Sequence, residues 1–284
     1  MTSLDTWVKG SRPRTLPAAI APVLLATALA GSAMKVIQAL LALLVSLALQ
    51  IGVNYANDYS DGIRGTDADR VGPIRIVASG LATPNSVRRA ALFSFFVAGV
   101  SGLILASLTS WWLLGVGASA ISAAWYYTGG ASPYGYKGFG EFSVFIFFGL
   151  VATMGSYYVQ TNELTWKSFL VALPMGSLSC SLLAINNIRD RAKDELAGKQ
   201  TLAVRLGDRG SRRLFVFLLL LAHLSALFVT PWALVTLALA PLTLALIRPV
   251  LKGASGKELI PLLGKTGKFQ LEFTALLAVI LWLT

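Results

Sequence analysis

The stretch VIQALLALLVSLALQIGVNYANDYSD, residues 36–61, begins as a long apolar segment and ends in a group of amides and carboxylates. Residues 36–56 carry no charge, and about 20 mostly apolar residues are enough to cross a bilayer as a helix. The stretch therefore predicts a membrane-spanning helix. Its acidic end, Asp58 and Asp61, lies where that helix should leave the membrane.

The rest of the chain belongs to the same class. It has 284 residues, of which 55% are hydrophobic and only 13% charged, and its mean hydropathy is +0.68. A typical soluble domain carries about 25% charged residues. We expect one all-α membrane domain over residues 1–284, a polytopic bundle of nine spans. The predicted spans are 16–34, 36–56, 87–108, 111–128, 142–160, 166–188, 213–229, 232–248 and 269–284.

The basic residues predict the orientation. If the N-terminus and the loops after spans two, four, six and eight share one side, every lysine and arginine except Lys35 and Lys167 falls on that side. The positive-inside rule then places the N-terminus and the long loops in the cytoplasm. Topology accounts for most of the net charge of +11. A nucleic-acid partner has no support, and the lipid bilayer is the expected surrounding.

The acidic residues are not explained by topology. Seven of the thirteen fall in two cytoplasmic stretches, which begin as NYANDYSD (54–61) and NNIRDRAKD (186–194). On a continuing helix, residues three, four or seven apart share one face. Each stretch would thus present amides and carboxylates on one side of a helix end, with arginines and lysines following. The similarity also suggests two pseudo-repeated halves, roughly 1–128 and 142–284.

Two carboxylate faces that point at a common space suggest a magnesium site. Mg²⁺ is commonly held by one or two carboxylates together with substrate phosphates. Neighbouring arginines and lysines would donate charge-assisted hydrogen bonds to the outer oxygens of a diphosphate. A single cluster of this kind would more often be a solvated loop. Two matched clusters with interleaved basic residues in a membrane protein favour a functional site.

Five stretches resemble one known family. They are RPRTLPAAIAPV (12–23), NDYSDGIRGTD (57–67), GPIRIVASG (72–80), YTGGASPYGYKGFGEFSVFIFFG (127–149) and NNIRDRAKDELAGKQTLAVRLGD (186–208). The chain resembles the UbiA superfamily of intramembrane aromatic prenyltransferases over essentially its whole length. Within that superfamily it looks most like the 1,4-dihydroxy-2-naphthoate polyprenyltransferases of menaquinone synthesis.

The resemblance implies a Mg²⁺-dependent transfer of a polyprenyl group from an allylic polyprenyl diphosphate to 1,4-dihydroxy-2-naphthoate, with loss of CO₂ and diphosphate. The site would face the cytoplasm of a bacterial plasma membrane. The implied catalytic residues and metal ligands are the same four carboxylates: Asp58, Asp61, Asp190 and Asp194. The implied substrate-binding residues are Asn54, Asn57, Arg64, Asp67, Arg75, Tyr134, Lys137, Asn186, Lys199 and Arg205.

The motif departs from the general pattern in one place. The superfamily has a further acid four residues after Asp61, where this chain has Gly65; Asp67 follows two residues later. Asp67 therefore receives a supporting role, and Asp69 is left to solvent.

Other residues admit two interpretations. Arg12 and Arg14 are either a positive-inside anchor or part of an aromatic-substrate pocket. The tyrosines of loop 126–141 are either interfacial residues or part of a lid over the site, where Lys137 would attract an acidic naphthoate. We expect His223 and Cys180 to be packing residues.

Two alternatives stay open. A related enzyme could use 4-hydroxybenzoate, homogentisate or haem as its acceptor. A cation-coupled transporter could also carry acids in repeated halves, although such acids belong at the midplane rather than at helix ends. The prenyl chain length, the oligomeric state, the basic residues that contact the diphosphate and any general base are not predicted.

Overall fold

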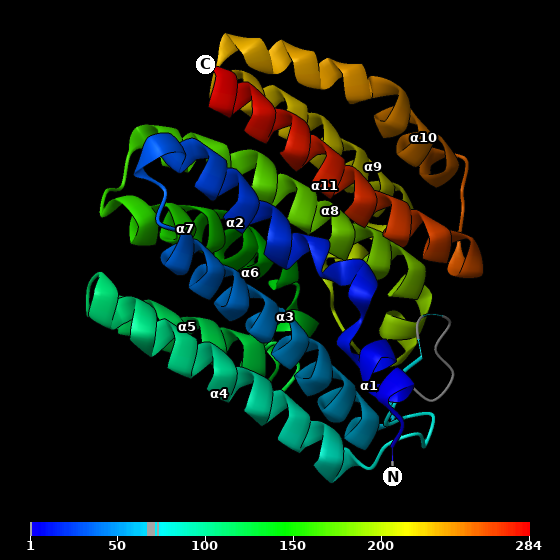
Figure 1. Ribbon diagram of the computed structural model, residues 1–284. Helices are drawn as coiled ribbons and strands as arrows, with labels where there is room; N and C mark the ends of the chain where they lie inside the picture. Colours follow the sequence, from blue (N-terminus) through cyan, green and yellow to red (C-terminus); the bar gives the residue numbers. More distant parts are fainter. Residues whose placement is uncertain (1, 67–71, 73) are drawn as a thin grey trace.

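A computed structural model describes residues 2–66, 72 and 74–284, and all regular structure in them is helical (Figure 1). The long helices lie side by side in one bundle, with α4 and α5 at one edge and α10 at the other. The α-helices are α1 (Leu4–Ser11), α2 (Pro17–Ala30), α3 (Val36–Arg64), α4 (Pro84–Leu108), α5 (Leu113–Tyr126), α6 (Gly140–Val144), α7 (Ala152–Thr161), α8 (Trp166–Leu196), α9 (Leu202–Leu227), α10 (Ala240–Leu251) and α11 (Leu259–Leu283). Short 3₁₀ segments include η1 (Pro13–Thr15), η3 (Tyr134–Lys137) and η5 (Pro231–Leu239).

The all-helical membrane architecture is confirmed, but the count of nine spans is not. Within the described part of the chain, seven helices are long and apolar enough to cross a membrane. The count rises to eight if Leu4–Thr15 and Pro17–Ala33, which meet at a bend of 56°, form one span. The segment predicted at 111–128 is the short helix α5, whose 14 residues reach only about 21 Å at 1.5 Å per residue.

Several helices extend beyond the predicted apolar segments. α3 continues to Arg64 and α8 to Leu196, and α11 begins at Leu259, while α9 begins at Leu202 and is kinked at Gly207, whose backbone is not helical (φ +67°). Hydropathy marks where a helix leaves hydrocarbon, whereas the helix itself ends where its backbone is capped. α3 ends at Gly65, which adopts the left-handed conformation (φ +71°) common after a helix C-terminus. The predicted continuation of both acidic helices is therefore confirmed.

α8 is the central helix of the bundle. In its spanning window 78% of the residues are buried, against 22% for α3. It packs on α9, α11 and α2, and the main hydrophobic core lies among these four helices. On the outside of the bundle, large apolar side chains such as Leu40, Phe93, Phe96, Phe217 and Leu224 are exposed, as expected for a surface solvated by lipid.

Glycine permits a close approach between the span Gly140–Thr161 and α8. Between α6 and α7 the chain forms a π-helical turn, η4 (Phe145–Val151), and these three segments make one span, Gly140–Thr161. A Cβ added at Gly149 would lie 2.5 Å from the Cα of Gly176 on α8. No larger residue fits at Gly149 without moving one of the two helices.

The N-terminal segment places polar residues against the end of α3. α1, which the hydropathy pattern did not predict, is capped by Ser3, whose side chain accepts a hydrogen bond from Thr6 N. The Tyr55 hydroxyl of α3 donates to the carbonyl of Trp7 at 2.8 Å. α1 and η1 thus lie at the same end of the bundle as the acidic ends of α3 and α8 (Figure 1).

Candidate active site

The two acidic helix ends meet at one polar cavity of about 350 Å³. Asp61 reaches it from α3, and Asp190 and Asp194 reach it from α8. Its lining also includes six basic residues from four parts of the chain: Lys9, Arg12, Arg14, Arg75, Arg189 and Lys199. We call this space the polar chamber. The predicted convergence of the two acid stretches on a common space is present in the structure.

Asp61 of the first stretch is buried among cations. It is 3% exposed, and Lys199 Nζ lies 3.3 Å from its Oδ1 while Arg75 Nη2 lies 3.5 Å from its Oδ2. The Tyr136 hydroxyl also donates to Oδ1. Burial, followed by the field and hydrogen bond of Asp61, raises the pKa of Tyr136 above its ordinary value of 10.0. Tyr136 therefore stays protonated and acts as a donor.

Lys199 connects the two acid stretches. Its ammonium lies 3.8 Å from Asp194 Oδ1 in addition to the contact with Asp61, and 4.5 Å from the centre of the Tyr136 ring. The backbone of Gln200 donates to the carbonyl of Tyr136 at 2.7 Å. The loop before α6 is thereby fixed across the polar chamber, which is the position that a lid requires.

Asp190 forms a bidentate ion pair with its neighbour Arg189. The guanidinium Nε and Nη2 each lie 2.8 Å from a carboxylate oxygen of Asp190. The remaining nitrogen, Arg189 Nη1, is buried with no hydrogen-bond partner among the described residues. A buried guanidinium N–H without an acceptor is costly unless a ligand supplies one. Arg189 was not predicted as a site residue, because its position within the acid stretch also fits a topological charge.

Asp58 lies outside both cavity linings. Its side chain is fully buried, and its two oxygens accept hydrogen bonds from the backbone of Ile76 at 2.9 Å and Val77 at 3.0 Å. This carboxylate therefore holds the segment that carries Arg75, the cation beside Asp61.

The predicted substrate-binding residues that the structure describes fall into three groups. Asn57, Asn186, Arg75 and Lys199 line the polar chamber, and Asn54 and Tyr134 line the apolar cavity described below. Arg64, Lys137 and Arg205 are exposed and line neither cavity. Asp67 lies outside the residues that the structure describes, as does Asp69.

Arg64 binds the loop 126–141 and does not line a cavity. Its guanidinium donates to the carbonyls of Thr128 and Gly130, and the Thr128 hydroxyl donates to Asn57 Oδ1 at 2.7 Å. This loop carries Tyr127 and Tyr136 into the lining of the polar chamber. The sequence showed only a cluster of tyrosines and glycines in this loop and did not indicate which of the tyrosines would line the site.

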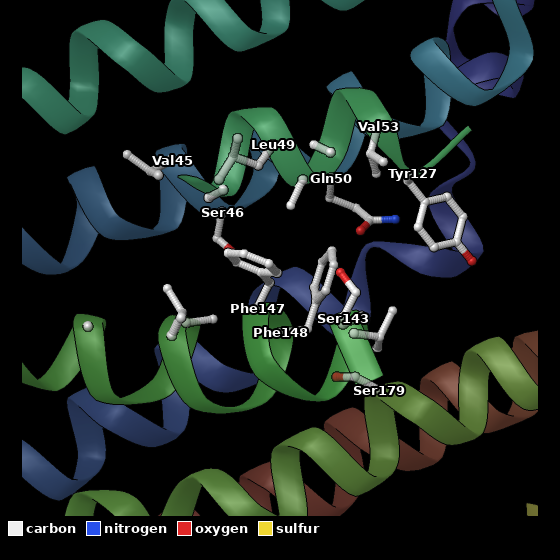
Figure 2. A pocket seen from close by; sticks show the side chains of 18 of the residues that line it. Val45, Ser46, Leu49, Gln50, Val53, Tyr127, Ser143, Phe147, Phe148 and Ser179 are labelled. Atoms are coloured by element: carbon white, nitrogen blue, oxygen red, sulfur yellow. The ribbon is translucent and has the colours of Figure 1, made fainter. Parts of the chain in front are cut away.

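A second cavity of about 290 Å³ adjoins the first, and we call it the apolar chamber. Figure 2 shows Phe147 and Phe148 facing Val45, Leu49 and Gln50 of α3 across this space. Six residues line both chambers, which places the chambers in contact: Arg12, Thr15, Asn57, Tyr127, Leu183 and Asn186.

Two packing predictions are confirmed. His223 is buried between Thr236 and Thr243, whose hydroxyls lie 3.3 and 3.0 Å from its ring nitrogens, and it lines neither chamber. Cys180 is 2% exposed, and its thiol donates to the carbonyl of Glu141.

The carboxylates suit a hard cation that shares its coordination with a ligand. In the part of the chain that the structure describes, no group of three or more Asp, Glu, His or Cys residues forms a ready metal cage. Mg²⁺ usually takes one or two carboxylates, with waters and phosphate oxygens completing its octahedron. Asp61, Asp190 and Asp194 provide oxygen donors of that kind around one chamber, and the buried N–H of Arg189 Nη1 provides a place for an anion.

Comparisons with known proteins agree with this architecture. The chain is 51% identical to the 1,4-dihydroxy-2-naphthoate octaprenyltransferase of Mycobacterium tuberculosis, over 98% of this chain and 97% of that protein. It is 38% identical to the enzyme of the same name from Escherichia coli, over 93% and 91% of the two chains.

Solved structures support the same fold. A UbiA homolog from Archaeoglobus fulgidus, described as bound to GPP and Mg²⁺, superposes with a TM-score of 0.69 at 13% identity, covering 98% of this chain and all of that one. A UbiA homolog from Aeropyrum pernix superposes with a TM-score of 0.68 at 15% identity, covering both chains fully. The model of the UbiA prenyltransferase family matches residues 19–283. The chain is therefore a member of the UbiA prenyltransferase family.

Proposed function

We propose that this protein transfers a polyprenyl group from an allylic polyprenyl diphosphate to 1,4-dihydroxy-2-naphthoate, releasing CO₂ and diphosphate and forming demethylmenaquinol. The observation that carries this proposal is the contact between the polar chamber and the apolar chamber. One substrate with an anionic head and an apolar tail would occupy both, so that its reacting carbon lies at their junction. The names of the curated relatives supply the acceptor.

The polar chamber would hold Mg²⁺ and the diphosphate. Asp61, Asp190 and Asp194 would supply the metal's protein ligands, and the metal would neutralise charge on the leaving diphosphate. Asp58 stays a predicted ligand. Each of its oxygens accepts one backbone hydrogen bond, from Ile76 or Val77, so ligation through Asp58 would use the remaining lone pairs of the carboxylate.

The cations of the chamber would bind the outer diphosphate oxygens. Arg189 Nη1 is already buried without a partner, and Lys199 and Arg75 lie beside Asp61. As the bond between the prenyl carbon and the diphosphate oxygen breaks, the electron pair leaves with the oxygen. Positively charged donors fixed at that position stabilise the growing negative charge.

The apolar chamber would protect the reactive prenyl carbon. Its aromatic wall at Phe147 and Phe148 excludes water that would otherwise capture an allylic cation (Figure 2). The ring carbon that carries the carboxylate forms the new bond. CO₂ then departs and leaves its electron pair to the ring, while the hydroxyl proton that is released on attack returns to the oxygen.

Together with this function we propose the membrane arrangement that the sequence predicts. We place the N-terminus and the polar chamber on the cytoplasmic side of a bacterial plasma membrane, with nine crossings that include the short helix α5. The chain forms one domain of two pseudo-repeated halves, and in each half an acidic helix is followed by its main packing partner, α3 by α4 and α8 by α9. The basic residues at the polar chamber support this orientation.

An acceptor panel tests the proposal. Purified protein in lipid nanodiscs would receive Mg²⁺, one polyprenyl diphosphate and, in separate reactions, 1,4-dihydroxy-2-naphthoate, 4-hydroxybenzoate, homogentisate or haem. We expect pyrophosphate release and a prenylated, decarboxylated product with the naphthoate alone. A product with another acceptor and none with the naphthoate would assign a different prenyltransferase. Transport of a cation without any prenylated product would assign a carrier.

A further inference from the structure

We propose that Arg12 anchors the carboxylate of the aromatic acceptor and so determines which acceptors the site takes. This inference rests on the proposed function and adds a specificity residue to it. Arg12 is the one charged residue that lines the apolar chamber, within the residues described, and it also lines the polar chamber. Arg12 therefore lies at the junction of the two spaces.

The conformation of Arg12 is unusual and is held in place. Its φ of +54° lies in the left-handed region, which residues other than glycine rarely adopt. Thr15 fixes this turn, since both its backbone N–H and its hydroxyl donate to the Arg12 carbonyl at 2.9 Å. Strained backbone of this kind persists where the surroundings enforce it, and it is frequent at ligand-binding positions.

Polar residues of α3 hold the turn against the bundle. Asn54 Nδ2 donates to the Ser11 carbonyl at 2.9 Å and to the Thr15 hydroxyl at 3.1 Å, and Gln50 Nε2 donates to the same hydroxyl at 2.9 Å. Gln50 and Asn54 are 6% and 3% exposed. Asn54, predicted to bind substrate, thus also positions the residue before Arg12.

The guanidinium of Arg12 has a buried nitrogen that requires an anion as hydrogen-bond acceptor. Nη2 is buried and has no hydrogen-bond partner among the described residues. A diphosphate in the polar chamber would have five other cations in the lining around it: Lys9, Arg14, Arg75, Arg189 and Lys199. In the apolar chamber no other described charge is present. The anion that fits beside aromatic walls is a carboxylate on an aromatic ring, held by charge-assisted hydrogen bonds.

Paired probes without turnover test this assignment. The dissociation constants of 1-hydroxy-2-naphthoate and of its uncharged carboxamide, 1-hydroxy-2-naphthamide, would be measured on the full-length protein in the absence of prenyl diphosphate. We expect wild type to favour the carboxylate by tenfold to a hundredfold, on the order of a charged hydrogen bond. Arg12→Gln should bring the ratio near one, and Arg12→Lys should keep part of the preference. Arg191→Gln, on α8 outside both linings, should leave the ratio as in wild type.

Each outcome has a defined meaning. Equal weakening of both probes by Arg12→Gln would overturn the inference, because it would show a structural role. An unchanged preference together with a raised KM for the prenyl diphosphate would also overturn it and would assign Arg12 to the diphosphate. The proposed function fails separately, if wild type binds the naphthoate through Arg12 but forms no prenylated product. If Arg12→Gln does not fold, the comparison of Arg12→Lys with wild type decides.

Discussion

The ammonium of Lys199 lies 3.3 Å from Asp61 Oδ1, so a lysine that follows α8 neutralises a carboxylate at the end of α3. The same ammonium lies 3.8 Å from Asp194. In the ligand-free protein, one side chain thereby offsets the mutual repulsion of carboxylates from both acid stretches. Lys199 is only 6% exposed, which makes its charge important for stability.

Lys199→Met should therefore destabilise the ligand-free protein. Removing this buried cation leaves Asp61 with Arg75 as its remaining ion-pair partner and costs about 1.5–3 kcal/mol, the range for hydrogen bonds to charged groups. We expect a melting temperature lowered by several degrees in a thermal unfolding assay, with partial recovery when Mg²⁺ and inorganic pyrophosphate are added. Lys252→Met, at an exposed lysine, should melt as wild type does. An unchanged melting temperature for Lys199→Met would refute the bridging role.

Asp58→Asn should loosen the segment at Ile76 and Val77. An amide has one oxygen in place of two, so it cannot accept both backbone hydrogen bonds in the same geometry. We expect faster amide hydrogen exchange at Ile76 and Val77, and activity reduced at least tenfold because Arg75 is carried by this segment. Normal exchange with lost activity would instead indicate direct metal ligation by Asp58, and full activity would exclude both roles.

Tyr136→Phe should reduce activity without changing the form of the pH profile below about pH 10. The raised pKa of Tyr136 means that its hydroxyl stays protonated at neutral pH and through the ordinary tyrosine range. A group with a raised pKa stabilises the fold fully below its unfolded value, and this contribution declines as pH rises above about 10. Rate measurements from pH 6 to 9.5 on both proteins test this. If the rate of wild type changes toward pH 9.5 and this change is absent in Tyr136→Phe, then Tyr136 titrates in that range and the prediction is wrong.

Gly149→Val should disrupt the contact between η4 and α8. The added Cβ would lie 2.5 Å from Gly176 Cα, which forces the two helices apart. Overpacking of this kind costs about 1–3 kcal/mol or more, and we expect a lower melting temperature and lower yield of folded protein. Gly155→Val, where an added Cβ meets nothing within 4 Å, is the matched control on α7. Equal stability of the two variants would contradict the close approach.

The sequence predicted the features that depend on local pattern. Apolar runs located the helices, and the spacing of Asp58, Asp61, Asp190 and Asp194 predicted carboxylates at two helix ends that meet. Helical periodicity and topology predicted that both acid stretches lie at cytoplasmic helix ends, and their meeting in one space was a hypothesis drawn from their similarity and from the family resemblance; Asp61, Asp190 and Asp194 do line one chamber. The length of α5 was not predictable in the same way, because a hydropathy window cannot separate a short helix from the turns around it.

Side-chain partners distant in sequence were beyond pattern analysis. Nothing in the motif shows that Asp58 accepts the amides of Ile76 and Val77, or that Lys199 contacts Asp61. The role of Tyr136 depends on how the loop before α6 crosses the chamber, which is set by the Gln200 backbone contact. These contacts can be identified only in the folded structure.

The central claim is that carboxylates from both helix ends hold one Mg²⁺–diphosphate complex. Its most direct test is Mg²⁺-dependent pyrophosphate release from a polyprenyl diphosphate in the presence of 1,4-dihydroxy-2-naphthoate, compared among wild type, Asp61→Asn and Asp190→Asn. We predict that wild type releases pyrophosphate only with Mg²⁺, and that each variant loses at least a hundredfold in rate while remaining folded by thermal unfolding. Normal Mg²⁺-dependent release by either folded variant would contradict the account.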